Sequence, residues 1–230
     1  MVQHVYERAS LAQYIRRVLV ATDDERIAAA VRRFGGEVRM TRSDHPSGTD
    51  RLAEIASSES ADLYVNIQGD EPLIDPEAID AATLAVLGDH TVSMGTLKKR
   101  ITDPSEIDNP NVVKVVTGLN GNALYFSRST IPYYRNRTGG PSDNGKRSSA
   151  AYFKHVGLYV YRRDFLLQYP ELDIGPLERA ERLEQLRALE NGYRIRVVET
   201  DYESLGVDTP EDLERVNKLF SQTMSVLEAE

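Results

Sequence analysis

Apolar residues recur along this chain at two spacings, which predict helices and strands in alternation. Val2, Val5 and Ala9 repeat every three or four residues, as on the buried face of a helix, whereas residues 18–21 form a continuous apolar run typical of buried strands. The first part of the chain is predicted to hold helices at 2–16, 24–34, 52–57 and 76–87, and strands at 17–22, 37–41, 62–67 and 91–98. This order predicts an α/β fold, with a wound, mostly parallel sheet and helices on its faces.

The second part of the chain has a different pattern. Two short apolar strands flank Gly118-Leu119-Asn120-Gly121, which favours a tight hairpin turn. Residues 133–151 are rich in Gly, Ser, Asn, Arg and Lys and predict a long loop. The remaining predicted elements are strands at 112–117, 122–127, 152–161 and 193–199 and helices at 176–191 and 209–224. We predict a single domain over residues 1–230, in which 120–175 can form a small β-rich lobe.

Composition narrows the function classes. The chain has 28 Lys and Arg against 36 Asp and Glu, and the net charge of −8 argues against non-specific nucleic-acid binding. It does not argue against a nucleotide whose phosphates are neutralised by a metal ion. The absence of cysteine excludes disulfides and thiolate metal sites. No apolar run approaches the ~20 residues of a membrane span, and the N-terminus lacks an apolar signal core. We expect a cytoplasmic protein with no nucleic-acid or membrane partner.

Two acidic positions suggest a metal site. Asp70 lies in the sequence Gln-Gly-Asp-Glu-Pro of residues 68–72, just after a predicted strand, where α/β sheets bind ligands. Asp208 precedes residues 209–212, whose Thr-Pro-Glu-Asp sequence is a good helix start that leaves Asp208 unexplained. Mg²⁺ commonly takes one or two carboxylates together with substrate phosphates. We predict that the two aspartates share one Mg²⁺, and we assign Glu71 to the loop alone. An ordinary turn with solvated acids explains residues 68–72 equally well.

A loop of small residues precedes the predicted helix at 52–57. Its members Ser47, Gly48 and Thr49 allow a ligand to approach the backbone, and the N–H groups of the following helix favour ligands rich in acceptors. Arg51 completes this segment. A capped helix start without a ligand is an equally good interpretation.

Glu184 interrupts an apolar stripe on the predicted helix at 176–191. The stripe contains Leu177, Ala180 and Ala188, and Gln185 lies beside it. A buried carboxylate is costly unless it has a partner. Glu184 is therefore either a ligand-binding residue or a residue at a helix edge that meets solvent or an arginine.

Two basic residues lie in or just after predicted strands. A single histidine within a strand, such as His155, is more often structural than functional. Arg128 follows a strand and is suited to bind a carboxylate in a fork, although a surface role fits equally well.

Together these segments resemble the 3-deoxy-manno-octulosonate cytidylyltransferases, or CMP-Kdo synthetases. The likeness extends from the first residue to about Phe220 and rests on the number and order of the motifs rather than on any single one. The motifs are Val20-Ala21-Thr22-Asp23, His45-Pro46-Ser47-Gly48-Thr49-Asp50-Arg51, Val65-Asn66-Ile67-Gln68-Gly69-Asp70-Glu71-Pro72, Ala123-Leu124-Tyr125-Phe126-Ser127-Arg128, His155-Val156-Gly157-Leu158-Tyr159, Leu183-Glu184-Gln185-Leu186-Arg187 and Gly206-Val207-Asp208-Thr209-Pro210.

The resemblance implies a wound α/β nucleotidyltransferase fold and an enzyme that is usually a homodimer. It also implies a role in lipopolysaccharide synthesis in a Gram-negative bacterium. The implied reaction transfers CMP from CTP to Kdo (3-deoxy-D-manno-octulosonate) and releases pyrophosphate. Asp70 and Asp208 are the implied Mg²⁺ ligands. The implied cytidine-binding residues are Ser47, Gly48 and Thr49, with Arg51 nearby. The implied sugar-acid residues are Gln68, Arg128, His155, Glu184 and Gln185. Arg128 and His155 are expected to offset the substrate carboxylate.

The family pattern also includes a strand and a phosphate-binding loop, with an arginine and a lysine, that precede the position of Met1. We expect the sheet of this chain to lack that strand at its centre and to present two open edges, and we expect the strand to be encoded upstream. Two alternatives remain open. One is a cytidylyltransferase for another sugar acid, such as sialic acid, and the other is a remnant that binds a sugar acid without catalysis.

Overall fold

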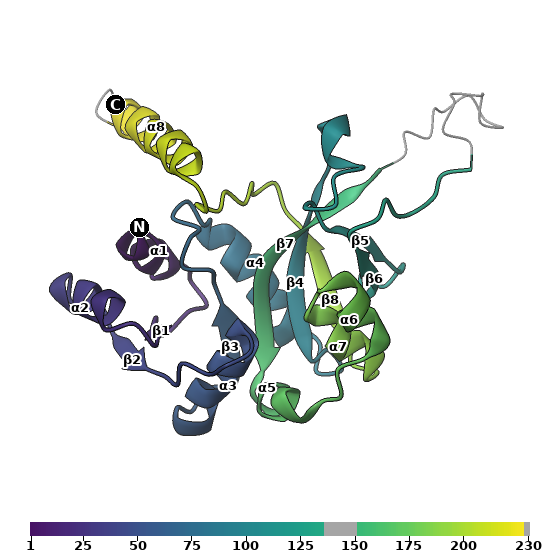
Figure 1. Cartoon of the computed structure of the whole chain (residues 1–230), viewed down its shortest axis with the longest axis horizontal. Helices are drawn as coiled ribbons and strands as arrows, with labels where there is room; N and C mark the ends of the chain where they lie inside the picture. Colours follow the sequence, from purple (N-terminus) through teal and green to yellow (C-terminus); the bar gives the residue numbers. More distant parts are fainter. Residues whose placement is uncertain (136–150, 228–230) are drawn as a thin grey trace.

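The computed structural model describes residues 1–135 and 151–227, which form two β-sheets with surrounding helices (Figure 1). The predicted loop at 133–151 falls mostly outside these residues. The smaller sheet pairs β1 (Val20–Thr22) in parallel with β2 (Val38–Met40). The strands of the larger sheet are β3 (Leu63–Asn66), β4 (Met94–Arg100), β5 (Lys114–Thr117), β6 (Ala123–Ser127), β7 (Phe153–Arg162) and β8 (Ile195–Glu199). Its order is β6-β5-β7-β4-β8, and β3 also pairs with β7.

Helices lie on both faces of the larger sheet. The bounds of all helices that the structure describes are α1 (Val2–Ala9), α2 (Glu25–Arg33), α3 (Gly48–Ser58), α4 (Pro76–Leu87), α5 (Arg163–Gln168), α6 (Pro176–Glu181), α7 (Gln185–Glu190) and α8 (Pro210–Leu227). The two core clusters place α1 and α4 on one face and α3, α5 and α7 on the other. Short 3₁₀ turns occupy Pro104–Glu106 and Tyr169–Glu171. Among the described residues, no helix is both long and apolar enough to cross a membrane.

Alternating side chains of β7 divide the core into two parts. Tyr159 and Tyr161 pack with residues of α3, α5 and α7 on one face. Leu158 and Val160 pack with α1 and α4 on the other. Successive side chains of a strand point to opposite faces, so this single strand contributes to both clusters.

The α/β prediction is confirmed, but the larger sheet is mixed rather than mostly parallel. β3 and β4, joined through α4, point the same way, as the pattern predicts, and β7 lies between them and runs antiparallel to both. β8 is parallel to β4. β5 and β6 are antiparallel because a short turn joins them. Helical crossovers produce parallel strands, and the chain from β5 to β7 contains no such helix among its described residues.

Two predicted helices are shorter in the structure. The helix expected at 2–16 ends at Ala9, since the backbone N–H groups of Gln13 and Tyr14 donate to the Asp80 carboxylate of α4 instead of continuing the helix. The helix expected at 176–191 is broken into α6 and α7 at Arg182, whose φ of 55° and ψ of 48° are left-handed. The prediction of one continuous helix with an apolar stripe through Glu184 is therefore wrong.

The two sheets are separate within the part of the chain that the structure describes. There β1 pairs only with β2, and β3 pairs only with β7. Each therefore has one edge without a strand partner among these residues, as the resemblance led us to expect.

Candidate active site

The two predicted metal-binding aspartates lie on adjacent segments. Asp70 follows β3, and the backbone N–H of Val207 donates to its carbonyl oxygen over 3.0 Å. A Cβ atom built on Gly206 would lie 3.7 Å from Asp70 Oδ2. The segment that carries Asp208 thus runs directly past the Asp70 loop.

Neither aspartate has a cationic partner among the residues that the structure describes. Asp208 is exposed and Asp70 half-buried, and no ion pair is formed by either carboxylate among the described residues. These residues also contain no group of three or more acidic, His or Cys side chains able to hold a metal ion. A pair of hard oxygen donors without a cationic partner fits Mg²⁺, which needs only one or two protein carboxylates when phosphates supply further ligands.

Glu71, which the sequence interpretation left without a function, is buried beside this pair. Its Oε2 accepts a hydrogen bond of 3.0 Å from the hydroxyl of Tyr202, and its carboxyl also contacts Ser204. Burial raises the pKa of Glu71, and the charge of Asp70 adds to that effect. The sequence alone does not reveal this burial, because Tyr202, the partner of Glu71, is remote along the chain.

The predicted cytidine loop contacts the predicted sugar residue Glu184. Ser47 caps α3 by accepting from Asp50 N–H over 3.2 Å, and Thr49 Oγ1 lies 3.0 Å from the hydroxyl of Tyr161. Burial raises the pKa of Glu184, while hydrogen bonds from Ser47 and Thr49 oppose that rise. Within the described parts of the chain, its Oε2 is buried without a hydrogen-bond partner. Residues assigned to two different substrates therefore form one polar cluster.

Two buried amides have unused donors near these residues. The Nδ2 of Asn66 and the Nε2 of Gln185 are buried without a partner among the described residues. A Cβ on Gly48 would approach Asn66 Nδ2 to 3.6 Å, which places the amide against the cytidine loop. A buried amide normally has a partner, so these donors are suited to a ligand. Asn66 belongs to the Val65–Pro72 motif, but the sequence prediction gave it no role. Gln68 is exposed at the start of the Asp70 loop.

The guanidinium of Arg128 is occupied by backbone carbonyl groups. Its Nε donates to Glu181 O over 2.7 Å and its Nη1 to Pro110 O over 3.1 Å. Its backbone N–H donates to the Glu181 carboxylate over 2.9 Å. The structure therefore anchors Arg128 at the end of α6, next to the break that precedes Glu184.

Arg51 is paired within the protein. Its Nη2 lies 3.1 Å from Asp23 Oδ1, and its Nη1 donates to the hydroxyl of Thr41. These contacts connect α3 to the ends of β1 and β2.

His155 is a neutral hydrogen-bonding residue. Burial lowers its pKa to about 3, which favours the neutral ring near neutral pH. This corrects the expectation that a charged His155 offsets the substrate carboxylate. Its Nε2 lies 2.9 Å from Thr96 Oγ1, which itself donates to Leu158 O over 2.7 Å. The hydroxyl of Thr96 has a single proton, which it donates to Leu158 O. It therefore accepts a hydrogen bond from Nε2–H of His155. The lone pair of the imidazole ring is then on Nδ1. Thr96 gave no recognisable signal in the sequence.

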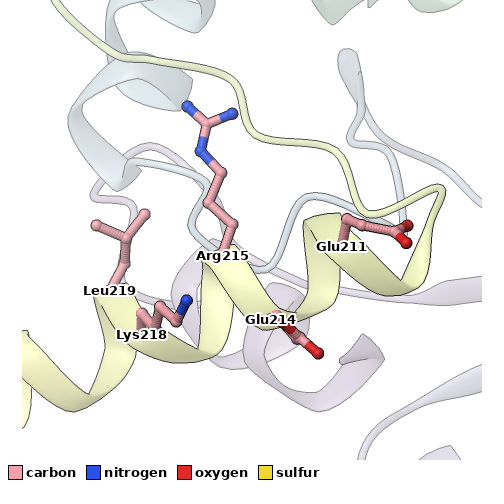
Figure 2. A pocket seen from close by; sticks show the side chains of 5 residues that line it. All are labelled: Glu211, Glu214, Arg215, Lys218 and Leu219. Atoms are coloured by element: carbon pink, nitrogen blue, oxygen red, sulfur yellow. The ribbon is translucent and has the colours of Figure 1, made fainter.

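A pocket on the surface of α8 lies apart from these residues. It is lined by Glu211, Glu214, Arg215, Lys218 and Leu219 (Figure 2). None of the predicted site residues lines it, and its open, charged walls provide no buried polar group.

Comparisons with known proteins identify the family to which the chain is similar. Residues 1–195 match the cytidylyltransferase family. The chain is 65% identical to a 3-deoxy-manno-octulosonate cytidylyltransferase of Solibacter usitatus over 97% of this chain and 85% of the relative. It is 56% identical to the protein of the same name from Geobacter metallireducens, over 96% of this chain and 88% of the relative. A solved CMP:2-keto-3-deoxy-manno-octonic acid synthetase complexed with CTP superposes with a TM-score of 0.88 at 45% identity, over 96% of this chain and 88% of that one.

Proposed function

Because the chain belongs to the 3-deoxy-manno-octulosonate cytidylyltransferase family, we propose that it transfers CMP from CTP to Kdo and releases pyrophosphate. In this reaction the anomeric hydroxyl of Kdo attacks the α-phosphorus of CTP in line. A new oxygen–phosphorus bond forms, the bond to the β-phosphate breaks and the hydroxyl proton is released. The observation that carries the proposal is the 65% identity to a relative of that name over 97% of this chain.

We assign Asp70 and Asp208 to one Mg²⁺. The hydrogen bond from Val207 N–H to Asp70 O and the absence of a cationic partner within the described residues support this assignment. Mg²⁺ bound there supplies charge neutralisation of the phosphates and orients the two substrates. Phosphoryl transfer depends mainly on positioning and charge stabilisation.

The polar cluster around Glu184 is assigned to both substrates. The loop of Ser47, Gly48 and Thr49 holds cytidine. Arg51, which is paired with Asp23, fixes the position of this loop. Glu184 presents an oxygen and Gln185 an N–H that have no partner in residues 1–135 and 151–227, and both suit the hydroxyl groups of a sugar.

The remaining sugar contacts come from other strands. With its lone pair on Nδ1, His155 accepts a hydrogen bond from a sugar hydroxyl rather than attracting the carboxylate. Gln68 and Arg128 complete the set.

Pyrophosphate release measured with CTP, Kdo and Mg²⁺ tests the reaction, and we expect turnover that EDTA abolishes. Substitution of sialic acid for Kdo separates this function from another sugar-acid cytidylyltransferase. Binding of Kdo without any turnover would identify a remnant and reject the proposed activity.

We further propose that the chain acts as one domain and assembles as a homodimer in the cytoplasm, where its product serves lipopolysaccharide synthesis. These parts rest on family membership. Light scattering of the purified protein tests the dimer, and cell fractionation tests the location.

A further inference from the structure

The chain between β8 and α8 has no regular secondary structure, yet neighbouring elements hold it at successive residues. Thr200 N–H donates to Lys98 O over 2.9 Å, and Lys99 Nζ donates to Asp201 O over 2.6 Å. Glu203 pairs with Lys99 at 3.0 Å and with Lys154 at 2.6 Å. These contacts fix residues 200–203 against the larger sheet.

A second set of contacts ties the same segment to the Asp70 loop. Tyr202 donates to the buried carboxyl of Glu71 over 3.0 Å, Ser204 bonds the same carboxyl, and Val207 N–H donates to Asp70 O. We call the contacts of Glu71 with Tyr202 and Ser204 the Glu71 bridge. Asp208 is the next residue after Val207, so its position follows from these contacts.

We propose that the Glu71 bridge is a positioning device that holds Asp208 in register with Asp70, and thereby sets the affinity for the divalent cation. The inference rests on the proposed function, because that function assigns the metal to these two aspartates. Glu71 itself does not touch the metal or the substrates. It acts by connecting two segments that are 138 positions apart at Asp70 and Asp208.

The chemistry of the bridge favours this role over simple stabilisation. A buried carboxyl costs free energy to desolvate, and apolar side chains of similar volume often stabilise as well or better. Tyr202 packs in an apolar cluster with Ile74 and Leu97, which would accept a phenylalanine. The directional hydrogen bond therefore adds registration that packing alone does not provide.

Tyr202→Phe tests the bridge, and Tyr64→Phe is the matched control. Both tyrosines are 8% exposed and donate one hydrogen bond. Tyr64 is near the start of β3 and donates to Glu59 O over 2.6 Å, a contact that involves neither the Asp70 loop nor the segment of Asp208. Binding of Mn²⁺ alone to the full chain is measured by electron paramagnetic resonance. We expect Tyr202→Phe to raise the Mn²⁺ dissociation constant about tenfold. This is the low end of the loss of metal affinity that follows when residues supporting the metal ligands are removed. We expect Tyr64→Phe to leave it unchanged.

Kinetics give an independent measurement. The Mg²⁺ concentration for half-maximal rate should also rise about tenfold in Tyr202→Phe, with the KM for Kdo unchanged. Glu71→Gln, which keeps an oxygen acceptor for Tyr202, should bind Mn²⁺ more tightly than Glu71→Ala. Equal Mn²⁺ affinity in Tyr202→Phe and Tyr64→Phe overturns the proposed role of the bridge. Failure of the unsubstituted protein to bind Mn²⁺ or turn over would instead overturn the proposed function.

Discussion

Replacement of Thr96 by valine should both destabilise the protein and release His155 from its fixed tautomer. Thr96 is fully buried at an irregularity of the β4–β7 pairing, where Thr96 pairs with Tyr159 but Leu97 pairs with Val156. Its hydroxyl donates to Leu158 O over 2.7 Å and lies 2.9 Å from His155 Nε2. Valine keeps the shape and removes both hydrogen bonds.

The size of the effect follows from the groups left without a partner. A buried polar group that is left without a hydrogen-bond partner costs about 1–3 kcal/mol, and here the Leu158 carbonyl and the His155 ring N–H each lose the hydroxyl of Thr96. We therefore expect Thr96→Val to lower the free energy of unfolding by about 2–4 kcal/mol. Thr83→Val is the control, because Thr83 is buried too but donates only to Ile79 O, one turn back in the same helix. Thr83→Val should therefore lower the free energy of unfolding by about 1 kcal/mol or less.

Two assays check this prediction. Urea unfolding of both variants gives the free energies. Nitrogen-15 NMR of the imidazole rings gives the tautomer, with His155→Gln identifying the signal among the four histidines. We expect Nε2–H in the unsubstituted protein and a mixture of tautomers in Thr96→Val. A proton on Nδ1 in the unsubstituted protein, or equal destabilisation by the two valines, would refute the reasoning.

The same residue predicts a pH dependence of stability. Burial lowers the pKa of His155 from 6.5 to about 3, so between these values the unfolded chain binds a proton that the folded protein does not. Stability therefore falls as the pH decreases from about 6.5 to about 3. His155→Gln should flatten this part of a plot of unfolding free energy against pH, and an unchanged slope would exclude His155 as its source.

Three further substitutions test separate parts of the site. Asp70→Asn should reduce kcat about 100-fold or more with an unchanged unfolding midpoint, because it removes a metal ligand, and near-normal turnover would remove Asp70 from the metal site. Burial raises the pKa of Glu184, so Glu184→Gln should stabilise the free protein by about 1 kcal/mol at neutral pH while raising the KM for Kdo. That gain should vanish below about pH 4, where the carboxyl is protonated in both states. Arg182→Gly should stabilise by about 0.5–1 kcal/mol in urea unfolding, since glycine adopts the left-handed conformation without strain; a loss of stability would contradict this.

The order of elements was predictable because it depends on local patterns. The periods of apolar residues located β1 to β4 and the helices between them, and the Gly118–Gly121 turn located the β5–β6 hairpin. The position of β7 between β3 and β4 was not predictable, because no local spacing specifies which strands pair. The break at Arg182 was missed for a related reason. An arginine is a good helix former, and its left-handed conformation accompanies tertiary contacts, including the anchoring of Arg128 on Glu181 O beside it.

For the site, the sequence singled out side chains that we propose to face ligands, but not the side chains that we propose to position them. Asp208 stood out because the helix start at residues 209–212 does not use it, and Asp70 because it follows a strand at a place where α/β sheets bind ligands. Glu71 and Thr96 act through partners that are 131 and 59 positions away, and such pairs leave no spacing that a single sequence reveals. The charge of His155 was mistaken for the same reason, since its pKa depends on burial that only the fold creates. Positioning residues are therefore the part of this site for which the tertiary structure is required, and the Glu71 bridge and Thr96 are its two instances.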